Sequence, residues 1–598
     1  MRSDSVKKKQ AVLWVVLSLA LLWPSVNLEA GTPLPGSSSR VDEKVYFDHR
    51  GLANFAIQQV EAPARALVLN ATSEEGLARL TRASEWSPEL PLVHFALAGE
   101  LGRLGEYQAA LQAGLRGVAA VSDHVEGRFW WMGSLGVLFA LMMIVSSLGF
   151  LFLVGLAFFR NAAHDLGDFF SLQMPTFARV ALLSACLLIP LALGEGLLGL
   201  SCGFFVIGVL YGRSIHRTTL ALAVVVLASG TFFVTDWAGQ AADALEADPV
   251  AGSSLALIRG RATPEQLEVL EYAAESSRDS LAIRTLAVHA GRLGDEVQLR
   301  QHLGNLLELE KNDPMALILL GNLAFRSGQS AEAARLYNQA SFRGDSFELF
   351  FNLAQAHAKT FRIQQFESAM AQAQRLDSER ATHLTGLGQP DLVLDPAFPM
   401  VALGQRLWLA SDGSPWVRFA SSRVAPGWLG VSPVNVLGIF ALLWIVAWAL
   451  HGRFEHAGHC KRCGTTICAR CDTSLWSNEI CDSCHFLFSR PKAADPLVRN
   501  ARIQTLWARE KRVGRCLALL SVSIPGFAGI RSRRPDLALV SIFLFTGAVV
   551  FWIFRHGPFP EPLITGEAAS LILASLSGLL FSAYLVSLLV GFSIHRRL

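Results

Sequence analysis

The chain alternates between long uncharged apolar runs and stretches in which apolar residues recur at helical spacing. The uncharged runs long enough to cross a hydrocarbon core of about 30 Å cover residues 130–159, 218–235, 434–450, 537–554 and 570–592. A further apolar run, 180–212, is interrupted by Gly194-Glu195-Gly196, which predicts two short spans joined by a tight turn. The pattern predicts a mainly α, multispanning helical membrane protein.

The composition agrees with this fold class. The chain has 598 residues, of which 52% are hydrophobic and 17% are charged, and its mean hydropathy is +0.37. These values exclude an ordinary soluble protein, and the length exceeds that of one domain. The formal net charge of +3 is too small to indicate a particular partner, so only the local distribution of charge is informative.

The N-terminus resembles a targeting signal. Lys7-Lys8-Lys9 precede the apolar residues 11–23, and Ala30 offers a mediocre cleavage site. Residues 1–30 are therefore either a cleaved signal peptide or an uncleaved signal anchor. Both interpretations stay open, and both start the chain on the cytoplasmic side.

Lysine and arginine at the ends of the spans set the orientation, because such residues stay on the inner face. Residues 31–129 and 236–433 are then exported, with nine Lys/Arg against twelve Asp/Glu and seventeen against twenty-three. Residues 451–536 are cytoplasmic, with fifteen against seven. The apolar stretch 516–530 is short and contains Pro525-Gly526, so we interpret it as re-entrant or interfacial. The result is eight spans in a bacterial inner membrane, with both termini cytoplasmic, or seven spans if the signal is cleaved.

The second exported segment has an internal period. Its marks are Leu286-Ala287, Leu320-Gly321 and Leu353-Ala354, spaced by 34 and 33 residues, with Gly294 and Gly328 at matching places after the first two. Apolar residues between these marks recur at i, i+3, i+4 and i+7, and a glycine-containing turn divides each unit. This spacing predicts stacked pairs of helices.

These units resemble the tetratricopeptide repeat, in which a small residue of the first helix lets the second helix pack close. Gly321, Gly328 and Ala334 match that pattern, whereas the third copy has Phe361 where the turn glycine belongs. The resemblance implies a concave surface for a protein partner within residues 265–378, and no chemistry. The individual partner-binding residues stay unknown.

The first exported segment contains a further copy of this repeat pattern. There, Ala98, Gly105, Tyr107 and Ala110 match the same family positions. One helical pair cannot bury its own apolar face, so residues 43–125 are predicted to hold two or three pairs. An ordinary helical hairpin is the alternative.

Six of the nine cysteines lie close together, as C-x2-C-x4-C-x2-C-x9-C-x2-C. Two cysteines with two residues between them direct their sulfurs to one tetrahedral ion, and two such pairs complete a zinc site. Seventeen residues separate the first pair from the last, within the spacing of a four-cysteine zinc site. The predicted ligands of a first zinc ion are therefore Cys460, Cys463, Cys481 and Cys484. The cytoplasmic location disfavours disulfides.

The stretch HCKRCGTTICARC, with the later ICDSC, resembles the final part of a FYVE-type, treble-clef double zinc finger. In that family the pairs interleave, so Cys468 and Cys471 need two further ligands for a second ion. The upstream C-x-x-C that supplies them in the family is absent, and His456 and His459 are the candidates to replace it. For each histidine the alternative is a polar residue at a membrane exit. Phosphoinositide recognition is not carried over, because the basic motif is incomplete.

Other chemistries are compatible with parts of this sequence. Cys463-x4-Cys468-x2-Cys471 fits a plant-type iron–sulfur triplet, but that site leaves further paired cysteines unused. The basic sequence after the finger suits nucleic acid, yet anionic lipid on the inner face explains it more simply. Catalytic signatures are missing, so no enzyme is expected. His164, Asp165 and Asp168 form another group of candidate metal ligands, with a solvated loop as the competing explanation.

The sequence thus predicts a membrane scaffold that binds proteins through exported repeats and carries a cytoplasmic finger with one or two zinc ions. A metal- or redox-responsive component of a signalling or transport system is the alternative. No nucleic-acid partner and no small-molecule substrate are expected. The predicted order is a signal or anchor (1–30), exported helices (31–129), about four spans (130–235), repeats with an irregular linker (236–433), a span (434–450), the finger and basic linker (451–515), and a re-entrant segment with two spans (516–598).

Overall fold

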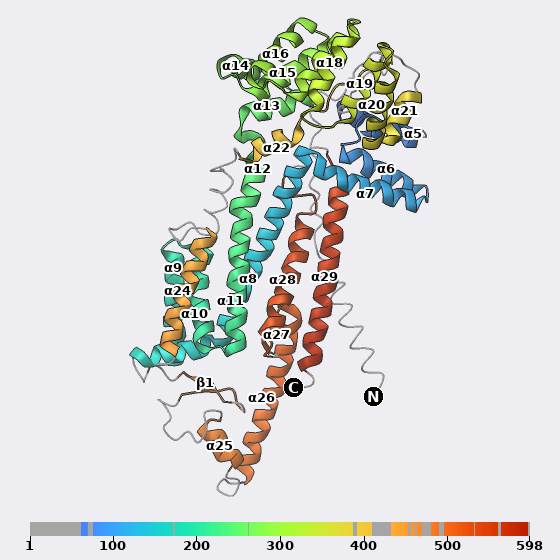
Figure 1. Ribbon diagram of the computed structural model, residues 1–598. Coiled ribbons are helices and arrows are strands. Elements are labelled where there is room, and N and C mark those ends of the chain that lie inside the picture. The colour runs from blue at the N-terminus through green and yellow to red at the C-terminus, as the bar shows by residue number, and fades with distance from the viewer. Residues whose placement is uncertain are drawn as a thin grey trace. The chain divides into compact units, whose positions relative to one another are not determined.

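The described part of the chain is almost entirely helical (Figure 1). The structure is a computed structural model that describes residues 61–69, 76–170, 174–260, 262–386, 392–409, 432–451, 456–460, 463–468, 480–489, 496–531, 533–559 and 564–595. Its one sheet in these ranges is a short antiparallel hairpin of β1 (Gly458–His459) and β2 (Thr466–Ile467). The mainly α fold is confirmed, while the predicted signal segment 1–30 lies outside the described residues.

Five helices of the described ranges are long and apolar enough to cross a membrane, judged by length and composition. They are α8 (Val125–Phe170), α11 (Ser214–Phe232) with its continuation through η1 (Phe233–Ala238) into α12 (Gly239–Ala247), α24 (Pro433–His451), α28 (Pro535–Ile553) and α29 (Glu567–His595). Each coincides with one of the uncharged runs of the sequence, and α28 ends one residue before the end of its run. Their insertion in a bilayer stays a prediction.

Two shorter apolar helices occupy the interrupted run. They are α9 (Thr176–Ala192) and α10 (Gly196–Tyr211), and the turn between them has Gly194 at φ +85° and Gly196 at φ +63°. Glycine adopts this left-handed backbone without steric cost, which explains the sharp reversal. At 1.5 Å per residue, each helix is about 25 Å long, slightly less than a hydrocarbon core.

Helix α8 packs against α10, α11 and α28. Small residues at the contacts allow these apolar helices to approach closely. A Cβ on Gly155 would lie 2.4 Å from Phe204 Cδ1, and one on Gly547 would lie 2.5 Å from Met142 Sδ. The helices therefore share one apolar core, which contains Phe150 and Phe205.

The basic linker after the finger is itself helical. Helix α25 (Asp482–Ser489) is followed by α26 (Pro496–Ser523), and α27 (Phe527–Arg531) then packs against α28 and α29. The apolar stretch 516–530 is thus divided between the end of α26 and α27, with the break at Pro525-Gly526. Its re-entrant or interfacial placement stays a prediction.

Two helical pairs form the described part of the first predicted repeat region. They are α4 (Glu61–Leu69) with α5 (Gly76–Trp86), and α6 (Pro91–Arg103) with α7 (Tyr107–Asp123). The turn between α6 and α7 has Gly105 at φ +83°. The glycine of the repeat pattern therefore stands where the backbone requires it.

The second repeat region is a series of helices, each in contact with the next. The series comprises α13 (Pro249–Ile258), α14 (Pro264–Ser276), α15 (Ser280–Leu293), α16 (Glu296–Leu309), α17 (Pro314–Arg326), α18 (Ser330–Ser341), α19 (Phe347–Lys359), α20 (Ile363–Leu376) and α21 (Ser378–Gly386). Leu286, Leu320 and Leu353 fall on α15, α17 and α19, the first helices of three successive pairs. The 34- and 33-residue period is confirmed as a period of helical hairpins.

The small residue expected in the first helix has a visible role. A Cβ on Gly321 would lie 2.4 Å from the ring of Tyr337 in α18. Tyr337 is fully buried, so its ring fills the space that the glycine leaves. This contact brings α17 and α18 close together, as the repeat pattern predicts.

The turns inside the three pairs share one backbone conformation. Gly294 and Gly328 have φ values of +74° and +80°, and Phe361 takes the same place in the third pair with φ +58°. Phe361 is 90% exposed, so its side chain contributes little packing. The degenerate copy keeps the geometry of the turn and carries the strain of a bulky residue in it.

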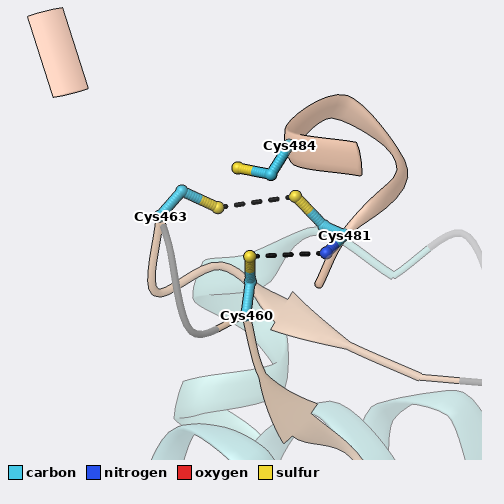
Figure 2. Close-up of side chains that lie close together, drawn as sticks. All are labelled: Cys460, Cys463, Cys481 and Cys484. Atoms are coloured by element: carbon cyan, nitrogen blue, oxygen red, sulfur yellow. Dashed lines mark hydrogen bonds between the residues drawn. The ribbon is translucent and has the colours of Figure 1, made fainter. Parts of the chain in front are cut away.

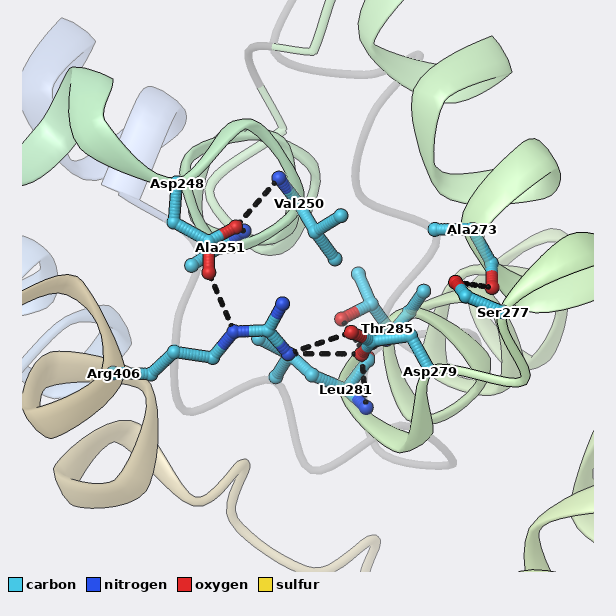
Figure 3. A network of polar contacts seen from close by, with 10 residues as sticks. Asp248, Val250, Ala251, Ala273, Ser277, Asp279, Leu281, Thr285 and Arg406 are labelled. Atoms are coloured by element: carbon cyan, nitrogen blue, oxygen red, sulfur yellow. Dashed lines mark hydrogen bonds and ion pairs between the residues drawn. The ribbon is translucent and has the colours of Figure 1, made fainter. Parts of the chain in front are cut away.

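Arg406 of α22 (Met400–Leu409) joins the first residues of two repeat helices (Figure 3). Its Nε donates to Asp248 Oδ2 at 2.6 Å, and its Nη1 donates to Asp279 Oδ1 at 2.9 Å. Each aspartate also caps its own helix, α13 or α15, because its Oδ1 accepts from two first-turn amides at 2.9–3.2 Å. One guanidinium thus pairs with two N-cap carboxylates.

Replacing Phe361 by glycine should stabilise the third pair. The change removes a left-handed penalty of about 1–2 kcal/mol, partly offset by the greater freedom of glycine in the unfolded chain. We expect a net gain of about 0.5–1 kcal/mol in the free energy of local opening, measured by amide hydrogen exchange of α19 and α20 in the full-length protein. Gly328→Ala is the matched control and should change exchange of α17 and α18 in the opposite direction. Unchanged amide exchange of α19 and α20 in Phe361→Gly would contradict the presence of backbone strain at Phe361.

Replacing Arg406 by glutamine should lower the free energy of local opening of α13 and α15 at neutral pH by about 1–2 kcal/mol. This is the scale of a hydrogen bond to a charged group. Partial burial raises the pKa of Asp248, but hydrogen bonds from Arg406 and from main-chain amides outweigh it, so the pKa lies below its usual value. This stabilisation is present above the unfolded pKa of about 3.9 and is lost as pH falls through the folded pKa.

Hydrogen exchange of α13 and α15 between neutral and acid pH measures both effects. Arg406→Gln should show a smaller acid-induced loss than wild type, because part of the pH-dependent interaction is already gone. Arg335→Gln is the control, since Arg335 pairs with Glu332 on the exposed surface of one helix. Equal acid profiles for wild type and Arg406→Gln would rule out the bridge.

Candidate functional site

The first cysteine pair lies on the turn of the β-hairpin. Cys460 follows β1, and the chain reverses at Gly464, whose φ is +70° and whose amide donates to the carbonyl of Cys460 at 2.9 Å. The amide of Cys460 donates in turn to the carbonyl of Thr465 at 2.9 Å. This tight turn directs the thiols of Cys460 and Cys463 to the same side.

The second pair lies at the start of α25. Cys481 immediately precedes the helix and Cys484 is in its first turn, so the two thiols are three residues apart and share one face. The amide of Cys481 donates to Cys460 Sγ at 3.3 Å. The N-terminus of a helix favours negative charge, which suits cysteine thiolates.

The four sulfurs point toward one another (Figure 2) and lie within 4.8 Å of one another. Cys463 Sγ and Cys481 Sγ are 3.5 Å apart, far beyond a disulfide bond. Zn–S bonds of about 2.3 Å place tetrahedral sulfurs about 3.8 Å apart. Cys460 and Cys484 are each only 2% exposed. The residues therefore fit a tetrahedral thiolate-bound metal, and zinc is the ion this donor set favours.

The protonation of these thiols couples to metal binding. Burial raises the pKa of Cys484 and of Cys481, and hydrogen bonds among the neighbouring thiols contribute further to the shifts. Metal ligation requires thiolates, so a divalent cation among the sulfurs would release protons. Binding at this site should consequently weaken in acid.

Three of the four residues predicted for a second ion lie in the described part of the chain. Cys468 follows β2 and is buried, and its sulfur lies with ligand atoms of His164, Asp165 and Asp168. The ring of His456 lies 5.1 Å from that of Tyr211. Cys471 lies outside the described residues, and His459 is in β1. The ion shared by Cys468, Cys471, His456 and His459 therefore stays a prediction.

A second candidate site is a face of the repeats that holds a non-helical stretch of this same chain. Residues 392–399 lie against α17 and α19, and Leu392, Val393 and Leu394 are buried in the core of these repeats. We call residues 392–399 the cis segment. The predicted irregular linker is therefore packed here rather than free.

Two asparagines bind the main chain of the cis segment. The Asn352 side chain accepts from the amide of Leu394 and donates to its carbonyl, each at 2.7 Å. Asn322 donates to the same carbonyl at 3.0 Å and to Asp395 Oδ1 at 2.7 Å. A side-chain amide that pairs with both groups of one residue recognises the extended backbone and not its side chain.

A tyrosine fixes the orientation of these asparagines. Tyr337 Oη donates to Asn322 Oδ1 at 2.7 Å, and Asn352 Nδ2 donates to the same oxygen at 3.0 Å. Burial raises the pKa of Tyr337, so its hydroxyl remains a donor. The sequence reasoning missed this site, although the triplet Asn-Leu-Ala occurs in both helices, at Asn322 and at Asn352, amid apolar residues.

Comparisons with known proteins give no family for this chain. No protein-family model matches it, and no curated protein matches it. Among solved structures, the crystal structure of the yeast Tom70 superposes with a TM-score of 0.22 and 9% sequence identity, over 89% of this chain and 96% of that chain. So low a score carries no argument, and the repeat architecture rests on the helices and turns described above.

Replacing Cys484 by serine should remove the metal from the four-sulfur site, because a serine hydroxyl does not replace a buried thiolate in zinc binding. Zinc per chain, measured by mass spectrometry on the purified full-length protein, should fall by one ion. Cys516→Ser is the matched control, since Cys516 is exposed and lies outside the cluster. Equal zinc content in Cys484→Ser and wild type would exclude this ligand set.

Proposed function

We propose that the protein is a membrane-embedded scaffold that binds protein partners on its helical repeats and carries a structural zinc finger. The observation that supports it best is the grip of Asn322 and Asn352 on the cis segment. The repeat face already binds a polypeptide in extended form through its main chain. A surface with this chemistry can accept other polypeptides whose side chains fit where those of the cis segment lie.

The cis segment indicates what such a partner would resemble. Its apolar residues Leu392 and Val393 are buried. Asp395 Oδ1 lies 3.6 Å from Arg326 Nη2. A partner strand with apolar residues followed by an acidic residue would make the same contacts. Because the face is occupied within the chain, partner binding there proceeds by displacement of the cis segment.

Further features support the membrane and finger parts of the proposal. The five long apolar helices suit a multipass protein, and the charge distribution favours a bacterial inner membrane with the repeats outside and the finger inside. The burial of Cys460 and Cys484 favours a structural finger over a sensor, since redox-sensing cysteines are exposed. The absence of catalytic signatures from the sequence favours a binding role over an enzymatic one.

Asn352→Ala should release the cis segment. Loss of two buried hydrogen bonds, each worth about 1 kcal/mol, should speed amide exchange of Leu394 by about tenfold or more in the full-length protein. Asn338→Ala is the matched control, because Asn338 in α18 bonds only to the carbonyl of Ala334 among the contacts described. Equal amide exchange of Leu394 in Asn352→Ala and wild type would show that Asn352 does not hold the cis segment.

A photo-crosslinking residue at position 326 then tests partner binding in cells. In wild type the crosslink should form within the chain, to the cis segment. In the Asn352→Ala background, crosslinks to other proteins should increase. The same residue at position 335, on the exposed side of α18, controls for random encounters. Crosslinks confined to the chain itself in both backgrounds would overturn the scaffold proposal for this face.

A further inference from the structure

The end of α8 and the end of β2 bring together four metal-binding side chains outside the four-sulfur site. The ligand atoms of His164, Asp165, Asp168 and Cys468 all lie within 4.8 Å of one another. We propose that these residues bind a divalent transition-metal ion, with zinc as the best match. This site is separate from the four-cysteine centre and shares no residue with it.

The two carboxylates are oriented as metal ligands are. Asp165 Oδ2 accepts from Tyr211 Oη at 2.8 Å and from the amide of Ala457 at 3.0 Å. Its other oxygen, Oδ1, lies 3.4 Å from His164 Nδ1. One oxygen is therefore held by outer partners while the other faces the cluster, which is the outer-shell arrangement that fixes ligands at metal sites.

Asp168 repeats this arrangement. Its Oδ1 pairs with Arg179 Nη1 at 3.0 Å, and its Oδ2 lies 3.2 Å from His164 Nδ1. Arg179 reaches this position across Gly167, where an added Cβ would lie 2.4 Å from Arg179 Cγ. The spacing of four residues places His164 and Asp168 on one face of α8. Both inward oxygens thus converge on one nitrogen.

The separations suit a tetrahedral ion. Bonds of about 2.0–2.1 Å from zinc to nitrogen and oxygen place neighbouring ligand atoms about 3.3 Å apart, close to the observed 3.2 and 3.4 Å. One imidazole, two carboxylates and one thiol favour a borderline ion such as Zn²⁺ over Ca²⁺ or Mg²⁺, which take oxygen ligands.

The charges of the cluster favour a cation. The side chains of Asp168 and Asp165 are only 4% and 13% exposed, and Arg179 is the cation paired with them among the ion pairs described. Carboxylates buried to this degree are costly unless they are paired or bind a metal ion. A divalent ion would offset the negative charge of these two carboxylates.

The proposed site would attach the finger to the end of α8. Ala457 precedes β1 and Cys468 follows β2, so the hydrogen bond and the sulfur ligand attach both ends of the hairpin to one helix end. The contact between α8 and β2 lies here. The four-sulfur site holds the finger together, and the proposed site holds it in place.

Metal content of the full-length protein in detergent tests the proposal. Wild type should bind one zinc ion more than His164→Ala, Asp168→Asn and Cys468→Ser. Cys471→Ser and Cys516→Ser should keep the wild-type content. Retention of the full content by His164→Ala and Asp168→Asn would overturn the site, and loss of an ion in Cys471→Ser alone would assign Cys468 to the finger instead.

Cobalt titration of the wild-type protein gives a test that does not depend on the folding of variants. The first ion at the four-sulfur site should give an intense thiolate charge-transfer band. A second ion at the proposed site should add a much weaker band, since it has one sulfur ligand. A titration that ends at one cobalt per chain, or a second ion with the spectrum of several thiolates, would overturn the proposal. The outcome is independent of partner binding by the repeats.

Discussion

A non-helical stretch can be buried among helices only if its amide and carbonyl groups find hydrogen-bond partners. Inside the repeats that requirement falls on Asn322 and Asn352, which satisfy the main chain of Leu394 within an apolar core. Their orientation depends on the hydrogen bond from Tyr337. The ring of Tyr337 fits in its place only because Gly321 has no side chain. The small residue that the repeat pattern requires at position 321 thus underlies a polar site that the pattern itself does not predict.

The same requirement acts at the helix ends. The first amides of α13 and α15 have no partner within their helices, so Asp248 and Asp279 accept from them. Two carboxylates near each other then need a cation, and Arg406 supplies it from α22. Local capping therefore produces a long-range contact, since the neutralising charge comes from a different part of the chain.

These dependencies explain what the sequence could and could not predict. Apolar periodicity depends on residues close in the chain, so the helices, the repeat period and the turn at Gly328 were predictable. Phe361 shows that a missing glycine need not mean a missing turn. The cysteine spacing indicated the four-sulfur cluster for the same local reason. The contact of Asp165 with the amide of Ala457 joins residues 292 apart, and no local pattern reveals such a neighbour.

Helix α8 extends the reach of these contacts. The cis segment runs directly into α22, whose Trp408 stacks on Phe129 near the start of α8, with ring centroids 6.0 Å apart. His164 lies 35 residues further along the same unbroken helix, about 50 Å away at 1.5 Å per residue. One continuous rod therefore touches the repeat region at one end and the finger at the other. A change at α22 that moved α8 would therefore also move the hairpin, because the same helix contacts both.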